Sequence, residues 1–519
     1  MKVITVAEMR NIEKSAAENG VSSHQLMESA SLGIAAFIQN HFSAEKSRLV
    51  TGLIGKGNNG GDSLLALTIL QQKGWKTEAW FLPSGKISAW TADYQAAGGI
   101  VKKFAEDPDF SEFDQSFGKS GLILDGVLGI GCHLPLDPDL AGILGHVKQL
   151  RGRDSALPRV IAVDCSSGVD CTSGKFADET IPADLTLCIE AAKEGQLSLS
   201  VLPLEGRIEC IPLNLQKEVY KEDFKIETLS RSEAGRLLPE RALDGNKGTF
   251  GNVIFIGGSE SYIGAAILSG SACYKMGAGL VKMVIPERNI SICAGKLPEA
   301  VWYPYSCLDE RNMEESLEQI LQLINDRTAF IIGPGLSSDT AHKKFLEKLF
   351  CRLQGVKNAC VIDADALNIC ASDKSVMESI PENAVLTPHP GEMARLCGKS
   401  VEEVQLDRRQ NALTFARKWN KVVVLKGALT LIASPDGRLA VNPYASSALA
   451  KAGSGDVLSG IIGGLLAQQM NLFDAARLGC LIHAEAGIAS EKQQGNPYTV
   501  MASDIIAEIQ TVLRTIRKE

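Results

Sequence analysis

Short apolar runs that end in glycine or a polar side chain, each followed by a helix-like segment, recur through both halves of this 519-residue chain. They include residues 48–54, 122–125 and 160–164 in the first half and residues 251–256 and 280–285 in the second. Strands that alternate with helices are typical of a mostly parallel sheet covered on both faces. The sequence therefore predicts an α/β fold.

The chain is too long for one ordinary domain. Apolar residues between Thr5 and Asn40 recur every three or four positions and predict two helices that separate near Gly20. Residues 216–232 are polar and lack helical periodicity, so we place a linker near residue 224. The sequence predicts two domains, residues 1–223 and 224–519.

Composition and charge limit the classes of molecule that this protein is expected to bind. The formal net charge is −8 and no dense Lys/Arg block occurs, which argues against nucleic acid and an anionic membrane surface. Thirteen cysteines stand without a C-x-x-C pair, so neither a disulfide framework nor a thiolate zinc site is expected. Charges lie among the first ten residues, and no run reaches the roughly 20 apolar residues of a membrane span. We expect a cytoplasmic protein that binds small molecules.

A glycine-rich segment, Gly-Lys-Gly-Asn-Asn-Gly-Gly-Asp at residues 55–62, follows the first predicted strand and precedes a helix expected from Ser63 to Gln72. Strand, glycine loop and helix in this order are typical of dinucleotide binding. The amides of Asn58 and Asn59 offer both donors and acceptors. The structural alternative is a plain turn with asparagine and glycine in left-handed conformations.

Polar residues also follow the later strands of the first half. Because the carboxyl ends of parallel strands meet in one crevice, Asn59, Asp125, Asp164 and Ser167 are expected to converge there. Their oxygens suit an alkali or alkaline-earth cation and are poor ligands for zinc. For Asp125 alone, a helix or turn cap is the alternative.

Segments 58–62, 125–131 and 164–168, in this order on these strand ends, resemble the NAD(P)H-hydrate epimerase domain, a Rossmann-like α/β/α fold. The resemblance implies that Asp164 contacts the substrate and that Asn59, Asp125 and Ser167 hold a potassium ion. It also implies two loops that bind the hydrated dinucleotide: Asn58, Asn59, Gly60, Gly61 and Asp62; and Gly129, Ile130, Gly131, Cys132, His133, Leu134 and Pro135.

The chemistry of such an epimerase needs a proton donor and acceptor. The substrate hydroxyl stands on a ring carbon next to nitrogen, so inversion can proceed by loss of water to an iminium and its return on the other face. We predict Asp164 as the catalytic acid/base. Lys193, after the last apolar strand of this half at residues 185–189, is a weaker candidate that we expect on the surface. The family usually has glycine where Ser63 stands and proline where Ser166 stands.

The most distinctive stretch of the second half is Gly453-Ser454-Gly455-Asp456, which precedes an apolar helix. Small residues at a helix N-terminus leave backbone N–H groups free for an anion. A carboxylate repels phosphate unless it accepts a proton or holds a cation, so Asp456 suggests a base beside a phosphoryl group. The alternative is a glycine turn whose aspartate caps the helix.

Four earlier strand ends of this half carry Gly333-Pro334-Gly335, Asp363 to Asn368, Thr387 to Glu392 and Lys426-Gly427. With residues 453–456 this set resembles the NAD(P)H-hydrate dehydratase domain, a ribokinase-like fold. The resemblance implies residues that face the hydrated dinucleotide, namely Ala265, Gly335, the segment His389–Arg395 and Asp456. It implies that the nucleotide is bound by the loop 446–455 with Gly455, and by Lys426, Gly427, Ala428, Leu429 and Thr430.

Together the two resemblances predict a bifunctional enzyme of the NAD(P)H-hydrate repair family. The first domain would equilibrate the R and S forms of hydrated NADH or NADPH. In the second, Asp456 would deprotonate the hydroxyl of the S form so that phosphoryl transfer from ADP, with Mg²⁺, gives AMP and a phosphate ester. Elimination of phosphate from this ester then restores the ring double bond. Bacterial members of the family use ADP, which is the nucleotide we expect. We also expect a homo-oligomer.

Two rival hypotheses stay open on the sequence. The second half fits a ribokinase-type small-molecule kinase, which would release a stable phosphorylated product. The first half fits a binding module without epimerase activity, a reading motivated by Ser63 and Ser166.

Overall fold

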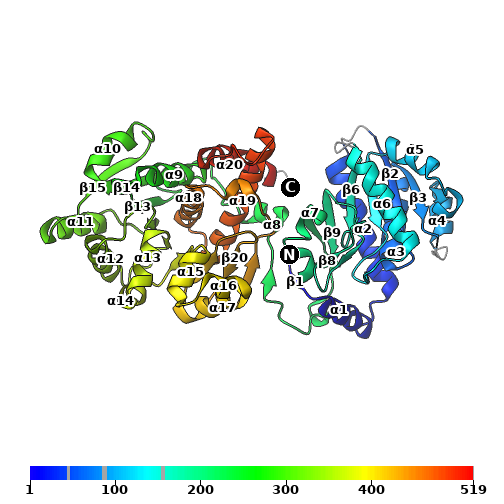
Figure 1. The fold of residues 1–519 in the computed structure, drawn as a ribbon, viewed down its shortest axis with the longest axis horizontal. Helices are drawn as coiled ribbons and strands as arrows, with labels where there is room; N and C mark the ends of the chain where they lie inside the picture. The colour runs from blue at the N-terminus through cyan, green and yellow to red at the C-terminus, as the bar shows by residue number, and fades with distance from the viewer. Residues whose placement is uncertain (44–46, 84–89, 154–157, 518–519) are drawn as a thin grey trace. The chain divides into compact units, whose positions relative to one another are not determined.

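Two separate sheets organise the chain, and the strands of each are mostly parallel, which confirms the predicted α/β class (Figure 1). The computed structural model describes residues 1–43, 47–83, 90–153 (without the Arg153 side chain) and 158–517. The chain divides into two compact units, Met1–Ile226 and Glu227–Glu519. Among the described residues, no helix combines the length and apolar character needed to cross a membrane.

The first unit contains a seven-stranded parallel sheet with strand order β11-β9-β6-β5-β2-β3-β4. The order reverses between β2 and β5, which places a crevice at their carboxyl ends. The last strand, β11, was not predicted. The bounds are β2 Leu49–Ile54, β3 Lys76–Phe81, β4 Ile100–Lys103, β5 Leu122–Gly126, β6 Arg159–Val163, β9 Leu185–Ile189 and β11 Arg207–Ile211.

Helices cover both faces of this sheet because successive residues of its central strands are mostly apolar and point to opposite faces. Val50 and Ile54 of β2 pack with α1, α2 and α3, whereas Leu53 packs with α5 and α6. The predicted break near Gly20 is confirmed, since α1 and α2 each begin with a capping box. The bounds are α1 Val6–Glu18, α2 Ser23–Phe42, α3 Asn58–Gln72, α4 Thr91–Ala96, α5 Ser111–Lys119, α6 Pro138–Arg153 and α7 Leu202–Glu205.

The predicted start of the third helix was wrong. α3 begins at Asn58 instead of Ser63, so Asn58 to Asp62 form its first turn. This first turn lies directly against the preceding loop, and a Cβ at Gly60 would come within 2.0 Å of the Gly55 carbonyl oxygen. The glycines therefore permit a helix start that packs against the end of β2, where a loop was expected.

The second unit contains a ten-stranded sheet of order β12-β21-β20-β19-β18-β17-β16-β13-β14-β15. Strands β13 to β19 are parallel, and β20 and β21 form an antiparallel extension. The bounds are β12 Ile226–Glu227, β13 Asn252–Ile256, β14 Leu280–Pro286, β15 Val301–Tyr305, β16 Thr328–Ile332, β17 Cys360–Ile362, β18 Ala384–Leu386, β19 Val422–Leu425, β20 Leu431–Ala433 and β21 Leu439–Val441.

The helices of the second unit also form two layers. Val253 and Phe255 of β13 pack with α9, α18, α19 and α20, whereas Ile254 and Ile256 pack with α11, α12 and α13. The bounds are α8 Arg231–Leu237, α9 Ile263–Lys275, α10 Glu287–Ala294, α11 Glu310–Gln322, α12 Thr340–Arg352, α13 Asp365–Ser372, α14 Lys374–Glu378, α15 Pro390–Cys397, α16 Val401–Leu406, α17 Arg408–Trp419, α18 Ser454–Ala467, α19 Leu472–Gln494 and α20 Ala502–Ile516.

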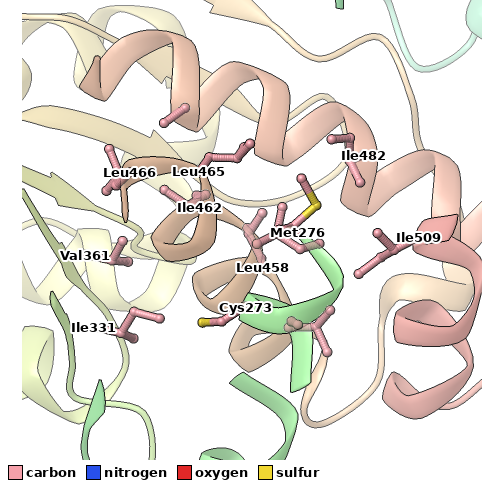
Figure 2. Packing of buried hydrophobic residues seen from close by; sticks show 14 of the residues in the cluster. Cys273, Met276, Ile331, Val361, Leu458, Ile462, Leu465, Leu466, Ile482 and Ile509 are labelled. Carbon is pink, nitrogen blue, oxygen red and sulfur yellow. The ribbon is translucent and has the colours of Figure 1, made fainter. Parts of the chain in front are cut away.

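Helix α18, the predicted helix after Asp456, is buried on nearly all sides. Figure 2 shows Leu458, Ile462 and Leu465 of α18 among apolar side chains of the neighbouring helices. Its glycines allow close approach to α9, because a Cβ at Gly460 would lie 2.3 Å from the Ser269 carbonyl oxygen. This packing fixes the first turn of α18, and Asp456 with it.

Candidate active sites

A cavity of about 760 Å³ lies in the first unit where the strand order reverses. Seven predicted residues line it: Asn58, Asn59, Asp62, Gly129, Ile130, Gly131 and Asp164. Gly60 and Gly61 are buried within α3, and Cys132 to Pro135 are not among the described residues that line the cavity. Helix α1 adds Met9, Arg10, Glu13 and Lys14, which the sequence analysis did not identify.

Asp164 forms an ion pair with Lys193, so the expectation of a surface lysine was wrong. The Lys193 side chain is fully buried, and its Nζ also donates to the Ile189 carbonyl at 3.2 Å. The burial arises because β10 (Ala192–Lys193) pairs with β1 (Val3–Ile4) at the start of the chain. Burial acts to lower the pKa of Lys193, but the Asp164 carboxylate more than offsets it and raises that pKa.

Asp164 itself adopts a left-handed conformation with φ of 66°. Its Oδ1 accepts a second hydrogen bond from the Ile189 N–H at 3.0 Å, and its own carbonyl accepts one from Gln196 Nε2 at 2.9 Å. A non-glycine residue with positive φ is uncommon and is maintained here by these contacts. The Asp164 carboxylate is therefore held in one orientation at the edge of the cavity.

Two further carboxyl groups share this cavity. Burial, followed by the charges of Asp164 and Glu13, raises the pKa of Asp62 well above its usual value. Burial and Asp164 also raise the pKa of Glu13. The raised pKa values of Asp62 and Glu13 favour a state in which at least one of the two keeps its proton, which supplies an acid in the cavity that Asp164 also lines. Glu13 follows Met9 by four residues on α1. The only sequence feature that could have indicated its role was a charged residue next to the apolar face of this helix.

The three residues predicted to hold a cation are linked through one buried network. Ser167 donates to both Asp125 oxygens, from Oγ at 2.5 Å and from its backbone N–H at 3.0 Å. Asn59 Nδ2 donates to the Leu128 carbonyl at 2.9 Å, and the Leu128 N–H donates to Ser167 Oγ at 2.9 Å. The Asn59 Oδ1 atom is buried without a hydrogen-bond partner among the described residues. An unpaired oxygen beside carboxylate and hydroxyl oxygens fits a hard cation such as potassium.

In the second unit, the ends of β17 and β19 bring Asp363 and Lys426 together. Lys426 Nζ lies 2.8 Å from Asp363 Oδ1 and 3.8 Å from Glu392 Oε2, and Ser459 Oγ of α18 donates to Asp363 Oδ2 at 2.5 Å. Burial acts to raise the pKa of Asp363, but Lys426 outweighs it and that pKa is lowered. Asp363 is thus an ionised anchor beneath the start of α18.

Asp456 lies in the first turn of α18, next to this pair but outside it. Its backbone carbonyl accepts a hydrogen bond from Ser269 Oγ at 2.7 Å. Burial and then the Asp363 charge raise the pKa of Asp456 to about 7, although Lys426 opposes them. A Cβ at Gly455 would lie 3.5 Å from Lys426 Nζ, so glycine keeps the helix start open above the lysine. A carboxyl group with this pKa is suited to general base catalysis near neutral pH.

The other predicted residues of this unit lie on neighbouring turns. A Cβ at Gly335 would come within 3.1 Å of Ala265 Cβ, so these two predicted residues are close. His389 caps α15 and accepts a hydrogen bond from the Gly391 N–H at 3.0 Å, and burial lowers its pKa. The predicted nucleotide loop, residues 426–430, connects β19 to β20.

Comparison with known proteins decides the family. The family described as YjeF-related protein N-terminus matches residues 23–195, and the family described as NAD(P)H-hydrate dehydratase matches residues 253–511. A bifunctional NAD(P)H-hydrate repair enzyme of Moorella thermoacetica is 33% identical over 100% of this chain and 98% of its own length. This chain belongs to the bifunctional NAD(P)H-hydrate repair enzyme family.

Other similar proteins have the same or a related name. The Escherichia coli bifunctional NAD(P)H-hydrate repair enzyme is 29% identical over 98% of this chain and 93% of its own length. A solved structure of the ADP/ATP-dependent NAD(P)H-hydrate dehydratase from Bacillus subtilis, co-crystallized with ATP/Mg²⁺, is 26% identical and covers 57% of this chain and 100% of that chain, with a TM-score of 0.48.

Ser63 and Ser166, where this chain differs from the usual pattern of the repair family, both form hydrogen bonds with nearby backbone groups. Ser63 Oγ donates to the Asn59 carbonyl at 2.8 Å within α3. Ser166 Oγ donates to the Leu204 carbonyl at 2.8 Å, and its N–H donates to Glu205 at 3.2 Å. Both hydroxyl groups are buried and paired, so neither leaves an unsatisfied polar atom beside the cavity.

Glu392 lies in the predicted segment His389–Arg395, whereas His483 of the same unit was missed. Burial raises the pKa of Glu392 to about 7, with Lys426 opposing and Asp363 assisting. His483 of α19 is buried, and its Nε2 lies 3.0 Å from both Ser454 Oγ and the Ser454 carbonyl oxygen. Burial lowers the pKa of His483 to about 4, so the ring is neutral and fixes the turn before Asp456. The only sequence signal of His483 was a polar residue within an apolar helix.

Proposed function

We propose that this chain repairs hydrated NADH and NADPH in two steps. The first unit interconverts the R and S epimers, and the second dehydrates the S form at the expense of ADP, giving AMP and phosphate. Similarity to repair enzymes over the whole chain supports both steps. Among the geometric observations, the partly buried Asp456 beside the Asp363–Lys426 pair carries the dehydration step.

In the epimerase step, the substrate ring carbon loses its hydroxyl as water and regains water on the opposite face. We propose Asp164 as the acid/base that faces the ring, with Lys193 and the Ile189 N–H holding its orientation. The developing iminium carries positive charge, which the carboxylates around the cavity stabilise. Potassium held by Asn59, Asp125 and Ser167 would supply a fixed positive charge that orders the dinucleotide-binding loops, a role supported by the unpaired Asn59 oxygen.

In the dehydratase step, Asp456 takes the proton from the substrate hydroxyl, whose oxygen then attacks the β-phosphorus of ADP as the bond to AMP breaks. The C–O bond of this phosphate ester then breaks, assisted by the ring nitrogen, and phosphate leaves with the bonding electrons. Loss of a proton from the adjacent carbon restores the double bond. Lys426 and the N–H groups at the start of α18 favour the transferring phosphoryl group. Mg²⁺ would offset phosphate charge, and hard oxygen donors such as Glu392 fit it.

The experiment supplies ADP or ATP to the purified chain with hydrated NADH and follows recovery of NADH absorbance. We expect recovery that requires a nucleotide, with ADP preferred. Phosphorylation of a sugar or pyrimidine alcohol without NADH recovery would favour the ribokinase-type rival. Supplying the R form alone tests the first unit, because dehydration no faster than spontaneous epimerisation would mean that this unit only binds.

A further inference from the structure

The turn after β19 is held by one arginine from a different element. Arg408 is the first residue of α17, and its guanidinium donates to three backbone carbonyls: Nη1 to Ala428 at 2.6 Å, and Nη2 to Leu425 and Lys426 at 3.3 Å each. These three hydrogen bonds converge on residues 425–428. A planar fork with several fixed donors is suited to bridging such a set of acceptors.

The position of Arg408 is unfavourable on local grounds. A cation at a helix N-terminus opposes the helix dipole, and the first turn of α17 contains no acidic residue. No carboxylate among the described residues pairs with Arg408, burial lowers its pKa, and its Nε is buried without an acceptor. An unpaired buried donor costs stability. The compensating gain visible in the structure is the set of bonds to the β19–β20 turn.

The backbone of this turn needs such a support. Gly427 has φ of 135° and Leu429 has φ of 55°, so two residues in alternate positions adopt the left-handed region. Among the described residues, the carbonyls of residues 425, 426 and 428 face Arg408, and no protein acceptor is found for the N–H groups of residues 427–430. Alternating backbone conformations with free N–H groups form concave anion-binding turns.

We propose that Arg408 is a positioning residue for the nucleotide: it holds the carbonyls of residues 425–428 to one side so that the following N–H groups stay presented to ADP. The inference rests on the proposed dehydratase function. Arg408 touches no reacting atom, so it acts on nucleotide binding and leaves the chemistry at Asp456 unchanged.

The test measures KM for ADP, KM for hydrated NADH and kcat in Arg408→Gln, Arg408→Lys and Arg417→Gln. Arg417 lies in the last turn of the same helix beside Gly437, so it is the matched control. We expect Arg408→Gln to raise KM for ADP about tenfold with kcat and the other KM within about twofold. Arg408→Lys should recover only part of the loss, because an ammonium lacks the planar fork. Arg417→Gln should match the wild type.

A second variant changes a residue of the turn itself. A Cβ at Gly427 would lie 3.0 Å from Arg408 Nη2 and would strain the backbone, so Gly427→Ala should also raise KM for ADP selectively. An unchanged KM for ADP in a folded Arg408→Gln, or equal loss in kcat and both KM values, overturns the inference while the proposed function stands. A wild-type chain without nucleotide-dependent NADH recovery overturns the proposed function instead.

Discussion

Each unit contains a buried lysine–aspartate pair at the carboxyl ends of parallel strands. In one unit the predicted catalytic carboxylate belongs to the pair, and in the other it does not. In the first unit the predicted residue, Asp164, is itself the partner of Lys193. In the second, Lys426 pairs with Asp363, and Asp456 lies outside the pair with its pKa raised to about 7. A paired carboxylate is held in place by its partner, whereas the raised pKa of Asp456 suits it to accept a proton near neutral pH.

The lysine–aspartate pair therefore has a different role in each unit. In the second unit, burial and the Asp363 charge raise the pKa of Asp456, and Lys426 opposes them. In the first unit, the Asp164–Lys193 ion pair lies at a cavity in which Asp62 and Glu13 have raised pKa values. The proposed acid/base of the first unit therefore has two further carboxyl groups beside it, whereas the proposed base function of the second rests on Asp456.

The largest effect is expected from Asp456→Asn, which removes the base with little change in volume. ADP-dependent dehydration should fall by about 10²–10⁴-fold, the usual contribution of a positioned general base. The epimerase rate should stay at the wild-type value because its site lies in the other unit. Kinetics on the separate R and S forms measure both; substantial remaining dehydration would contradict the role of Asp456.

Lys193→Met tests the pair of the first unit. It leaves the Asp164 carboxylate without its buried cation, which should lower the free energy of unfolding by about 3–5 kcal/mol and abolish epimerisation. Hydrogen exchange of the β6 and β9 amides localises the loss to this unit. Adding Asp164→Asn should restore part of the stability. Stability equal to the wild type in the single variant would mean that the pair is dispensable.

The pH dependence should separate the two carboxylates of the second unit. Asp456 accepts a proton only when ionised, and its pKa is raised to about 7, so dehydratase kcat/KM should rise about tenfold per pH unit below pH 7 and level off above it. The lowered pKa of Asp363 keeps its charge constant over this range. A profile that is flat between pH 5 and pH 8, measured with epimerisation in the same buffers as control, would contradict this assignment.

Removal of potassium should affect the first unit only. Replacing K⁺ by tetramethylammonium should slow epimerisation, and Asn59→Ala should weaken K⁺ binding about tenfold or more because it removes the unpaired oxygen. The thermal midpoint gives a readout independent of activity, since a bound ion stabilises the folded state. Dehydration of the S form serves as the control, and a midpoint insensitive to K⁺ would argue against the site.

The smallest effect is expected from Ser63→Gly, which restores the residue usual in the family. The Ser63 hydroxyl bonds only within α3, so its loss and the added helix flexibility should cost about 0.5–1 kcal/mol. Epimerisation should change by less than about threefold. A large gain of activity would show instead that the serine impairs the natural site and would favour the binding-module rival.

Much of the fold was predictable because its signals are local. Continuous apolar runs marked the buried central strands of both sheets, and the residues at their ends marked where the sites lie. The start of α3 was misplaced because the glycines of residues 57–61 indicate a loop by propensity, and only close packing against β2 makes them helical. The buried state of Lys193 was missed for a similar reason, since it depends on pairing with residues at the very start of the chain.

The sequence by itself determined the α/β class, the family and the residue types available at each strand end. Tertiary structure alone decided which of those residues meet, and therefore which carboxylate is paired and which is left to titrate. The physical reason is that the pKa of a group follows its burial and the distance to other charges, and both are set by contacts between segments far apart in the chain. Asp164 and Asp456 are the same residue type, and only the neighbours supplied by the fold pair one with a buried lysine and raise the pKa of the other to about 7.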